Sequence, residues 1–538
     1  MATLTTASAA ESDARVAPRR DPMGVTGSRY SGPARNTVFN ILGRAIPALI
    51  GIPCVPFIVR GLGPDRFGLL GIIWALLIYF NLFDLGFGRA SVKLIAELRA
   101  GGRPEKVASV VWTSLAAQVV LGFAGAAVFY LATPVFVERV LKVPLAMRGE
   151  ARTTFLIIAL SLPLLLLGNG MQAVLEGCHR FDLLNAVRIP SLSLLFVLPA
   201  LGAPLGLHLP GIALLIVATR ILAGFTCFSL CARVIPELTR WKAADREITR
   251  RLLSFGGWVT VISIIDPILL YLDRFLIGSI LSIALVGYYT APFEGVTRAL
   301  WLFPTSLGAT LFPLSSALGI QAANKGYMQA LYVRSFKILL LALVPAASLI
   351  FVFAPEIVKL WLGPSFATYG VGVIRILSVG VLVSCFVHLP SNFIYGLGRP
   401  DVVAKLLLTE LPFYAPFCYL MVRGFGIDGA ALAWSIRVAV DVALMTFFAH
   451  RLFGMPLAPF RERGAFRAFL LAASLVALLL VTTGGHLLNV WARGGIALIL
   501  LAAYGWAVWR WALDDADRTA ATGVAGDLFL SDPAEVSA

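Results

Sequence analysis

Residues 283–310 read IALVGYYTAPFEGVTRALWLFPTSLGAT, an apolar segment whose only charged residues are Glu294 and Arg298. A helix of about 20 apolar residues crosses the hydrocarbon core of a bilayer, so this segment is long enough to span a membrane. The two charges stand four positions apart and would share one helix face. A charge at mid-bilayer costs about 2.5–3.5 kcal/mol, so we expect that face to meet a wet cavity, or the two charges to pair.

The composition of the whole chain extends this interpretation. The 538 residues are 59% hydrophobic and only 14% charged, whereas a soluble globular protein is nearer half apolar and a quarter charged. In lipid, the backbone N–H and C=O groups must be satisfied within their own segment, which favours helices. We therefore expect an all-α polytopic membrane protein.

Apolar runs of sufficient length predict about fourteen transmembrane helices. They cover residues 37–60, 66–88, 107–132, 153–175, 184–206, 210–233, 252–276, 283–310, 333–354, 370–395, 402–422, 427–450, 467–487 and 493–512. Polar tails flank them at residues 1–35 and 514–538, and we expect both tails to be disordered and cytoplasmic.

Short segments that recur at one spacing indicate an internal duplication. LEGCHRFDLL at 175–184 resembles IYGLGRPDVV at 394–403, and GLHLPGIAL at 206–214 resembles GFGIDGAAL at 424–432. The repeat unit holds six spans, an even number, so both copies insert the same way up. Such copies should be related by a pseudo-twofold axis along the membrane normal, as in two-lobed transporters.

This duplication divides the chain into lobes. An N-terminal six-helix lobe covers 36–235, a basic cytoplasmic linker covers 236–251, and a C-terminal six-helix lobe covers 252–452. Two additional transmembrane helices follow in 453–513. They lie outside the repeat.

Charge and motif content exclude several classes of function. The net charge of +15 fits the positive-inside rule, and Lys and Arg concentrate in inside loops when both termini are cytoplasmic. The sequence contains no nucleic-acid-binding motif, no phosphate loop and no H-E-x-x-H or G-x-S-x-G motif. The six cysteines show no metal-ligand spacing. We expect no metal, no cofactor, no nucleic-acid partner and no enzymatic activity.

Arginines well inside predicted spans form the first candidate site. They are Arg44, Arg188, Arg220, Arg298 and Arg437. Arginine offers a rigid fork of donors that matches phosphate oxygens, and it stays charged at physiological pH. These residues predict a cationic cavity for an anionic substrate such as a lipid diphosphate. The alternative for any one of them is a structural ion pair, or a side chain that reaches back to the interface.

Carboxylates inside spans are candidate sites for a coupling proton or sodium ion. They are Asp84, Asp266, Glu294, Glu410 and Asp441. Glu294 and Asp441 each stand four residues from an arginine, so the alternative role is a static ion pair. Asp266 has no such neighbour and precedes Pro267, which makes it the better coupling candidate.

Prolines inside spans are candidate hinges. They are Pro47, Pro53, Pro267 and Pro292. Each proline removes a helix hydrogen bond and permits a kink. The alternative is a static bend that fits the packing.

Several long segments of this sequence resemble those of a known family. They are RGLGPDRFGLLGIIWALLIYFNLFDLGFGRA (60–90), YLDRFLIGSILSIALVGYYTAPFEGVTRALWLFPTSLGATLFP (271–313), IVKLWLGPSF (357–366) and GLGRPDVVAKLLLTELPFY (396–414). The chain resembles the Wzx-type flippases of O-antigen and exopolysaccharide repeat units. These belong to the multidrug/oligosaccharidyl-lipid/polysaccharide (MOP) exporter superfamily. The resemblance covers about 36–450.

The resemblance implies two six-helix lobes in a V around a central cavity. It also implies a function in polysaccharide and lipopolysaccharide biosynthesis. Undecaprenyl-diphosphate-linked oligosaccharide would cross the bacterial inner membrane by alternating access, with coupling to H⁺ or Na⁺. Membrane lipid and the polysaccharide polymerase machinery are the expected partners.

Two other functions stay open. A multidrug extruder of the same fold would carry cations and should have an acidic cavity. A membrane polymerase or ligase of the same pathway should carry an indispensable residue in an outer loop.

Overall fold

The computed structural model describes residues 33–240, 246–318, 325–458, 463–483, 489–514 and 517–518. Every regular element within these ranges is helical. Ten of the described helices are long and apolar enough to cross a membrane. The prediction of an all-α polytopic membrane protein is therefore confirmed.

The first half of the chain supplies six α-helices. They are α1 (Pro33–Tyr79), α2 (Phe87–Ala100), α3 (Val107–Val135), α4 (Leu145–Gly177), α5 (Phe181–Gly202) and α6 (Leu209–Val234). A 3₁₀ turn, η1 (Phe80–Asp84), joins α1 to α2. The helix α2 is short and amphipathic, and it lies between two predicted spans.

The second half supplies eight more. They are α7 (Arg246–Ile280), α8 (Ile283–Leu318), α9 (Lys325–Val352), α10 (Ala354–Trp361), α11 (Pro364–Gly396), α12 (Pro400–Phe453), α13 (Arg463–Thr483) and α14 (Val490–Ala507). Short helical turns complete the chain, among them η7 (Val508–Ala512) after α14.

Two of these helices each contain two predicted spans. The helix α1 covers the first span and most of the second, and it leaves helical geometry at Gly63, where φ is 73°. The helix α12 covers the eleventh and twelfth spans and turns at Gly426, where φ is 62°. Glycine accepts such left-handed angles without a steric penalty, so each helix can change direction there.

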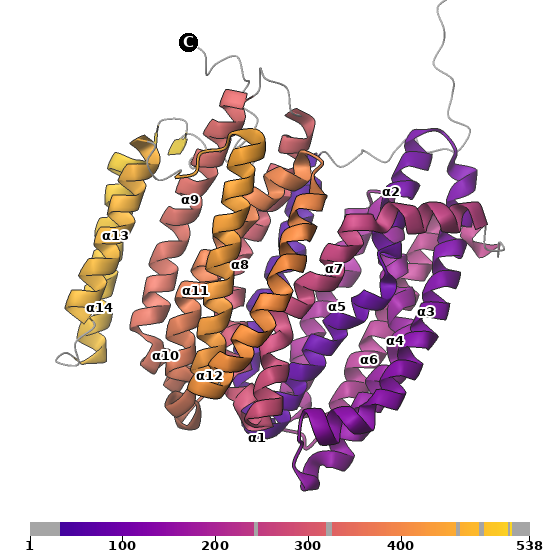
Figure 1. The fold of residues 1–538 in the computed structure, drawn as a ribbon, viewed down its shortest axis with the longest axis horizontal. Coiled ribbons are helices and arrows are strands. Elements are labelled where there is room, and N and C mark those ends of the chain that lie inside the picture. Colours follow the sequence, from indigo (N-terminus) through magenta and orange to yellow (C-terminus); the bar gives the residue numbers. More distant parts are fainter. Residues whose placement is uncertain are drawn as a thin grey trace, which may run out of the picture.

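The helices form two groups that meet along α1 and α8 (Figure 1). In the first group, α4 packs against α3 and α6, and α5 packs against α1. In the second group, α11 packs against α8, α9 and α12. The helices α13 and α14 lie at the outer edge of the second group, where α13 packs on α9.

The contact between α1 and α8 depends on glycine. A Cβ atom at Gly68 would lie 2.0 Å from the carbonyl oxygen of Ile283, and one at Gly287 would lie 2.4 Å from the carbonyl oxygen of Pro64. Both neighbours are backbone atoms, which cannot swing aside as a side chain can. The two helix backbones can approach this closely because neither position carries a side chain.

Two turns are built alike at the positions of the predicted repeat. Arg180 donates two hydrogen bonds to Asp182, of 3.0 and 2.9 Å, between α4 and α5. Arg399 donates two to Asp401, of 2.9 and 3.2 Å, between α11 and α12. In both turns the residue before the arginine has a positive φ, 56° and 77° respectively. This local likeness supports an internal duplication.

Candidate functional site

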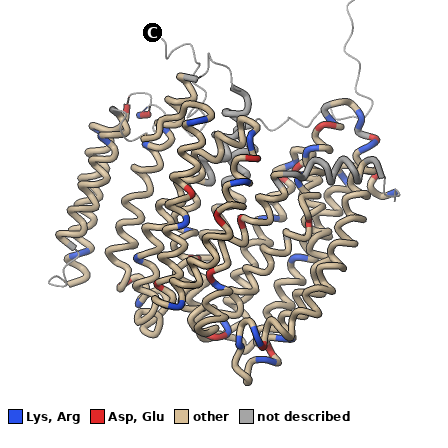
Figure 2. Tube along the Cα trace, viewed as in Figure 1, with Lys and Arg blue, Asp and Glu red and all other residues tan. Residues whose placement is uncertain are grey.

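Three of the five predicted cavity arginines line one cavity of about 320 Å³. Arg188 comes from α5, Arg220 from α6 and Arg298 from α8. Glu294 of α8 also lines the cavity. Charged residues are few in the middle of the described helices, as Figure 2 shows. The cavity lies between the two helix groups, since α8 belongs to the second.

The charge of this cavity is positive. Among the described residues, neither Arg188 nor Arg220 has a carboxylate within ion-pair distance. Arg298 is paired with Glu294, so these two charges cancel. The remaining polar lining is uncharged and comes from Asn169, Gln172, Ser191 and Tyr271. Two uncompensated guanidinium groups remain, which suits an anion.

Arg298 crosses from one helix group to the other. Its Nη2 donates a 2.6 Å hydrogen bond to Oε2 of Glu294, one turn earlier on α8. Its guanidinium carbon lies 4.1 Å from the ring centre of Phe196 on α5. The side chain is 20% exposed, so part of it reaches the cavity. Stacking on the ring face favours the cation and fixes its orientation.

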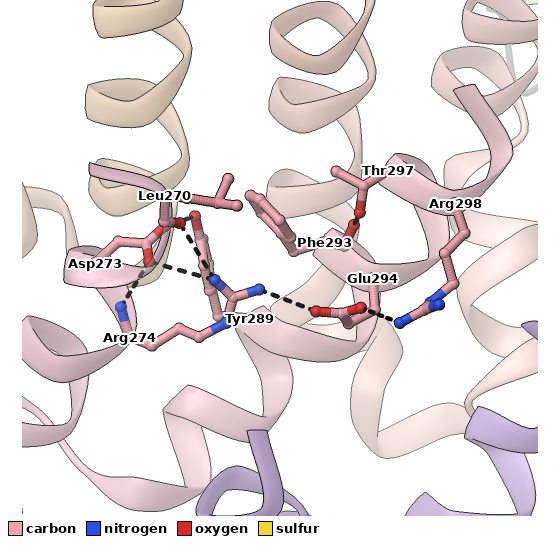
Figure 3. Close-up of polar contacts among 8 residues, drawn as sticks. All are labelled: Leu270, Asp273, Arg274, Tyr289, Phe293, Glu294, Thr297 and Arg298. Atoms are coloured by element: carbon pink, nitrogen blue, oxygen red, sulfur yellow. Dashed lines mark hydrogen bonds and ion pairs between the residues drawn. The ribbon is translucent and has the colours of Figure 1, made fainter. Parts of the chain in front are cut away.

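Glu294 has a second partner, Arg274 of α7, which was not among the predicted site residues. Nη2 of Arg274 donates to Oε1 of Glu294 over 3.2 Å, as Figure 3 shows. Nη1 of Arg274 lies 3.6 Å from Oδ1 of Asp273, and the Tyr289 hydroxyl donates to Oδ2 of Asp273. Charges of alternating sign therefore run from Asp273 to Arg298.

Arg274 is completely buried. Its guanidinium carbon lies 4.5 Å from the ring centre of Tyr271 and 4.4 Å from that of Phe293. The predicted span 252–276 placed Arg274 at a membrane interface, but α7 continues to Ile280. The apolar residues after Arg274 were the signal that could have revealed a deeper position.

Arg437 does not join the cavity and belongs to a second charged cluster. Its Nη1 donates a long hydrogen bond of 3.4 Å to Oε2 of Glu410, and both residues lie on α12. Asp441, one turn after Arg437, is buried as well. The exposed side chain of Asp266 on α7 interacts electrostatically with Arg437 and with Arg89 of α2. Arg437 therefore pairs with one buried carboxylate, Glu410, and a second one, Asp441, lies one helix turn away.

Asp84 has a different environment. Its Oδ2 accepts a 2.8 Å hydrogen bond from the backbone N–H of Gly88, and its Oδ1 accepts one of 2.6 Å from Gln118. Asp84 thereby connects the start of α2 to α3. The side chain of Arg44, on α1, lies outside the described residues.

The predicted hinge prolines lie inside helices. Pro47 and Pro53 are in α1, Pro267 is in α7 and Pro292 is in α8. Helical geometry in α1 is interrupted at Gly63. Whether the helices bend at these prolines during function stays a prediction.

Comparison with known proteins identifies relatives that match most of the membrane region. The family described as "Polysaccharide biosynthesis protein" matches residues 34–318. A protein of Shigella flexneri named "Putative O-antigen transporter" is 28% identical over 430 residues, which cover 78% of this chain and 98% of that protein.

Two solved structures share the fold. The lipid II flippase MurJ in an inward closed conformation aligns with a TM-score of 0.68 at 12% identity, over 88% of this chain and 98% of that chain. An inward-facing multidrug resistance MATE family transporter of the MOP superfamily aligns with a TM-score of 0.66 at 16% identity, over 78% and 97%. At these identities the similarity concerns the fold.

Proposed function

Since the chain belongs to the polysaccharide biosynthesis protein family, we propose that it is a flippase for a polyprenyl-diphosphate-linked oligosaccharide in the bacterial inner membrane. The cavity lined by Arg188, Arg220 and Arg298 carries this proposal. A diphosphate presents several anionic oxygens, and guanidinium forks bind such oxygens with charge-assisted hydrogen bonds. A lipophilic cation would be repelled there, which disfavours the multidrug extruder.

Glu294 holds Arg298 until the head group arrives. A diphosphate in the cavity competes for Nη2 of Arg298, which now bonds to Oε2 of Glu294. When Arg298 turns to the diphosphate, Oε1 of Glu294 keeps its hydrogen bond from Arg274. The buried carboxylate therefore retains a positive partner throughout, and the exchange avoids the cost of an unpaired buried charge.

The cluster around Arg437 is the proposed coupling site. Glu410 and Asp441 are buried carboxylates, and among the described residues only Glu410 is hydrogen-bonded to Arg437, so binding a proton or Na⁺ would neutralise the excess negative charge. Asp266 of α7 interacts electrostatically with Arg437 and adds a third carboxylate to this cluster. The proposed transport cycle is alternating access, with ion binding in the second helix group and substrate in the cavity between the groups. Positive-inside charge favours cytoplasmic termini.

Leaflet exchange in reconstituted vesicles tests the proposal. The purified protein and a polyprenyl-diphosphate oligosaccharide are placed in liposomes under an imposed proton or sodium gradient, and an outside enzyme reports sugar reaching the outer leaflet. We expect Arg188→Ala, Arg220→Ala and Arg298→Ala each to slow exchange by about tenfold or more, because each removes charge-assisted hydrogen bonds.

Arg375→Ala is the matched control. Arg375 lies in α11, outside the cavity, and stacks on Phe351. Exchange should stay close to wild type in this variant. If the wild type shows no exchange under either gradient, the flippase proposal is wrong; if all three cavity variants match the Arg375 control, the cavity assignment is wrong.

A further inference from the structure

Trp361, the last residue of α10, connects the two helix groups by a hydrogen bond. Its indole Nε1–H donates to the backbone carbonyl oxygen of Ile52 on α1 over 3.0 Å. The helix α10 packs on α9 and α11 of the second group, whereas α1 packs against α5 of the first. The bond therefore crosses the line along which the two groups meet.

The carbonyl of Ile52 is free for this donor because of a proline. In an α-helix, each carbonyl accepts a hydrogen bond from the N–H group four residues later, which for Ile52 is position 56. That position is Pro56, inside α1, and proline has no N–H. A backbone carbonyl without a partner is costly within a membrane protein. Trp361 supplies the missing donor from the other helix group.

The same pairing occurs between α9 and α14. Pro345, inside α9, removes the intrahelical donor of the Leu341 carbonyl, and that carbonyl accepts a 3.1 Å hydrogen bond from the Tyr504 hydroxyl of α14. A carbonyl freed by proline is thus a point at which a second helix can be attached through a side-chain donor. The Tyr504 pair lies within the second helix group, whereas the Trp361 pair joins two groups.

A glycine on α8 makes room for the indole ring. A Cβ atom at Gly295 would lie 2.4 Å from Cη2 and 2.6 Å from Cζ3 of Trp361. The ring therefore occupies the space that a side chain of α8 would take, while its N–H reaches α1. The backbone N–H groups of Leu362 and Gly363 both donate to the Val358 carbonyl, which ends α10 directly after Trp361.

The turn of α1 that accepts this bond also lies against a cavity arginine. A Cβ atom at Gly51 would lie 3.4 Å from Nη1 of Arg298. Gly295, which makes room for the indole, directly follows Glu294, the hydrogen-bond partner of Arg298. Arg298 and Trp361, both from the second helix group, therefore contact the same turn of α1.

We propose that Trp361 is a positioning residue for transport, whose hydrogen bond to Ile52 holds α1 against α8 beside the cavity and breaks when the helix groups separate. This proposal rests on the proposed function, because alternating access requires that separation. Breaking the bond leaves the Ile52 carbonyl without a donor on its own helix, so opening carries a cost. A diphosphate that binds Arg298 acts on the same turn of α1, which links occupancy of the cavity to opening.

The distance between the helix groups, measured without ligand, tests the proposal. Leu205, between α5 and α6, and Phe425 of α12 are 81% and 69% exposed and belong to different groups. Both lie at the end of the bundle where α1 turns at Gly63 and α11 begins. Leu205→Cys and Phe425→Cys carry spin labels, and pulsed dipolar EPR spectroscopy of the full-length protein in nanodiscs gives the distance distribution. The unsubstituted chain, labelled in the same way, gives the background from the native cysteines.

Trp361→Phe removes the donor and keeps an aromatic ring. We expect it to raise the ratio of separated to closed molecules about fivefold, the effect of one net hydrogen bond. Tyr504→Phe is the matched control, because it removes the donor to a proline-freed carbonyl within the second helix group. Its distance distribution should equal that of the wild type. If Trp361→Phe also equals the wild type, the proposal is wrong.

Pro56→Ala examines the acceptor of the same bond. It returns an N–H to the Ile52 carbonyl, so opening no longer leaves that carbonyl unpaired, and the ratio of separated to closed molecules should rise in this variant too. This result decides the proposal if Trp361→Phe does not fold. In the Pro56→Ala background, Trp361→Phe should change the ratio by less than about twofold. An undiminished effect would mean that Trp361 acts through its ring contact with Gly295, which would contradict the proposed role of the carbonyl.

Failure of this proposal can be told apart from failure of the proposed function. If the wild type moves lipid-linked oligosaccharide in vesicles while Trp361→Phe leaves the distances unchanged, the role of Trp361 is refuted and the proposed function stands. If Trp361→Phe shifts the distances while the wild type moves no lipid under either gradient, the hydrogen bond controls separation of the groups but the flippase proposal is wrong.

Discussion

Glu294 owes its position to residues on two helices. Arg298 lies one turn away on α8 and is its local partner, whereas Arg274 reaches it from α7. Arg274 is completely buried and Arg298 is partly exposed. We therefore expect the two arginines to have different roles. Arg274 holds the Glu294 carboxylate in place, and Arg298 is accessible to a ligand.

Replacing these two arginines should separate stability from transport. Arg274→Met leaves Asp273 without its buried cation, and breaking a buried pair in this way costs about 3–5 kcal/mol. We expect a clearly lower melting temperature in detergent. Arg298→Gln should melt close to wild type but lose transport. Equal melting temperatures for both variants would contradict the division of roles.

The helices α13 and α14 are attached to the second helix group at two places. Lys337 of α9 contacts Asp514 at 2.9 Å and Asp517 at 2.5 Å, beyond the end of α14. At the other end, Arg493 of α14 contacts Glu356 of α10 at 2.5 Å. Ion pairs at both ends should make these helices move together with α9.

The contact at Asp517 should weaken in acid. Burial alone would raise the pKa of Asp517, but the hydrogen bond from Lys337 and the charges of Lys337 and Arg334 hold that pKa below its usual value. Asp517 therefore stabilises the folded chain above the ordinary carboxyl pKa of about 3.9, and this stabilisation is lost as the pH falls through the lowered value. The protection of η7 amides against hydrogen exchange, taken relative to the intrinsic rate at each pH, should fall over that range.

Lys337→Met is the matched variant. It removes the cation, so the acid-induced change in η7 should largely disappear and exchange should be fast already at neutral pH. Protection that is independent of both pH and Lys337 would show that apolar packing of α13 on α9 alone holds these helices.

The two helix groups contact each other where α1 packs against α8. Gly68 and Gly287 allow the two backbones to touch there, so this contact sets how closely the two helix groups approach at that end. If transport follows the alternating access proposed above, we expect this contact to open and close during each cycle.

A methyl group at this contact should lower both the stability of the protein and its transport rate. Gly68→Ala places a Cβ against the Ile283 carbonyl oxygen, and overpacking of this kind costs about 1–3 kcal/mol. Gly149→Ala is the control, because a Cβ at Gly149 meets open space. We expect Gly68→Ala to melt lower and to transport more slowly than Gly149→Ala. Identical behaviour of the two variants would mean that the contact is not required in the cycle.

Apolar length alone determined the fold class. Whether a segment enters a membrane as a helix depends on its own residues, so the sequence predicted an all-α membrane protein. The chain belongs to the polysaccharide biosynthesis protein family and shares the fold of the lipid II flippase MurJ. The short helices α2 and α10 were not predicted, because they lie between the predicted spans. The predicted duplication was inferred from its two similar turns, which carry the same Arg and Asp residues.

The sequence by itself determined that buried arginines exist and that Glu294 and Arg298 share a helix face, since helix geometry is local. Only the tertiary structure decided that Arg188, Arg220 and Arg298 line one cavity and that Arg437 lies elsewhere. It also brought Arg274 to Glu294. The physical reason is that partners on different helices depend on how those helices pack and rotate against one another, and no periodicity within one segment contains that information.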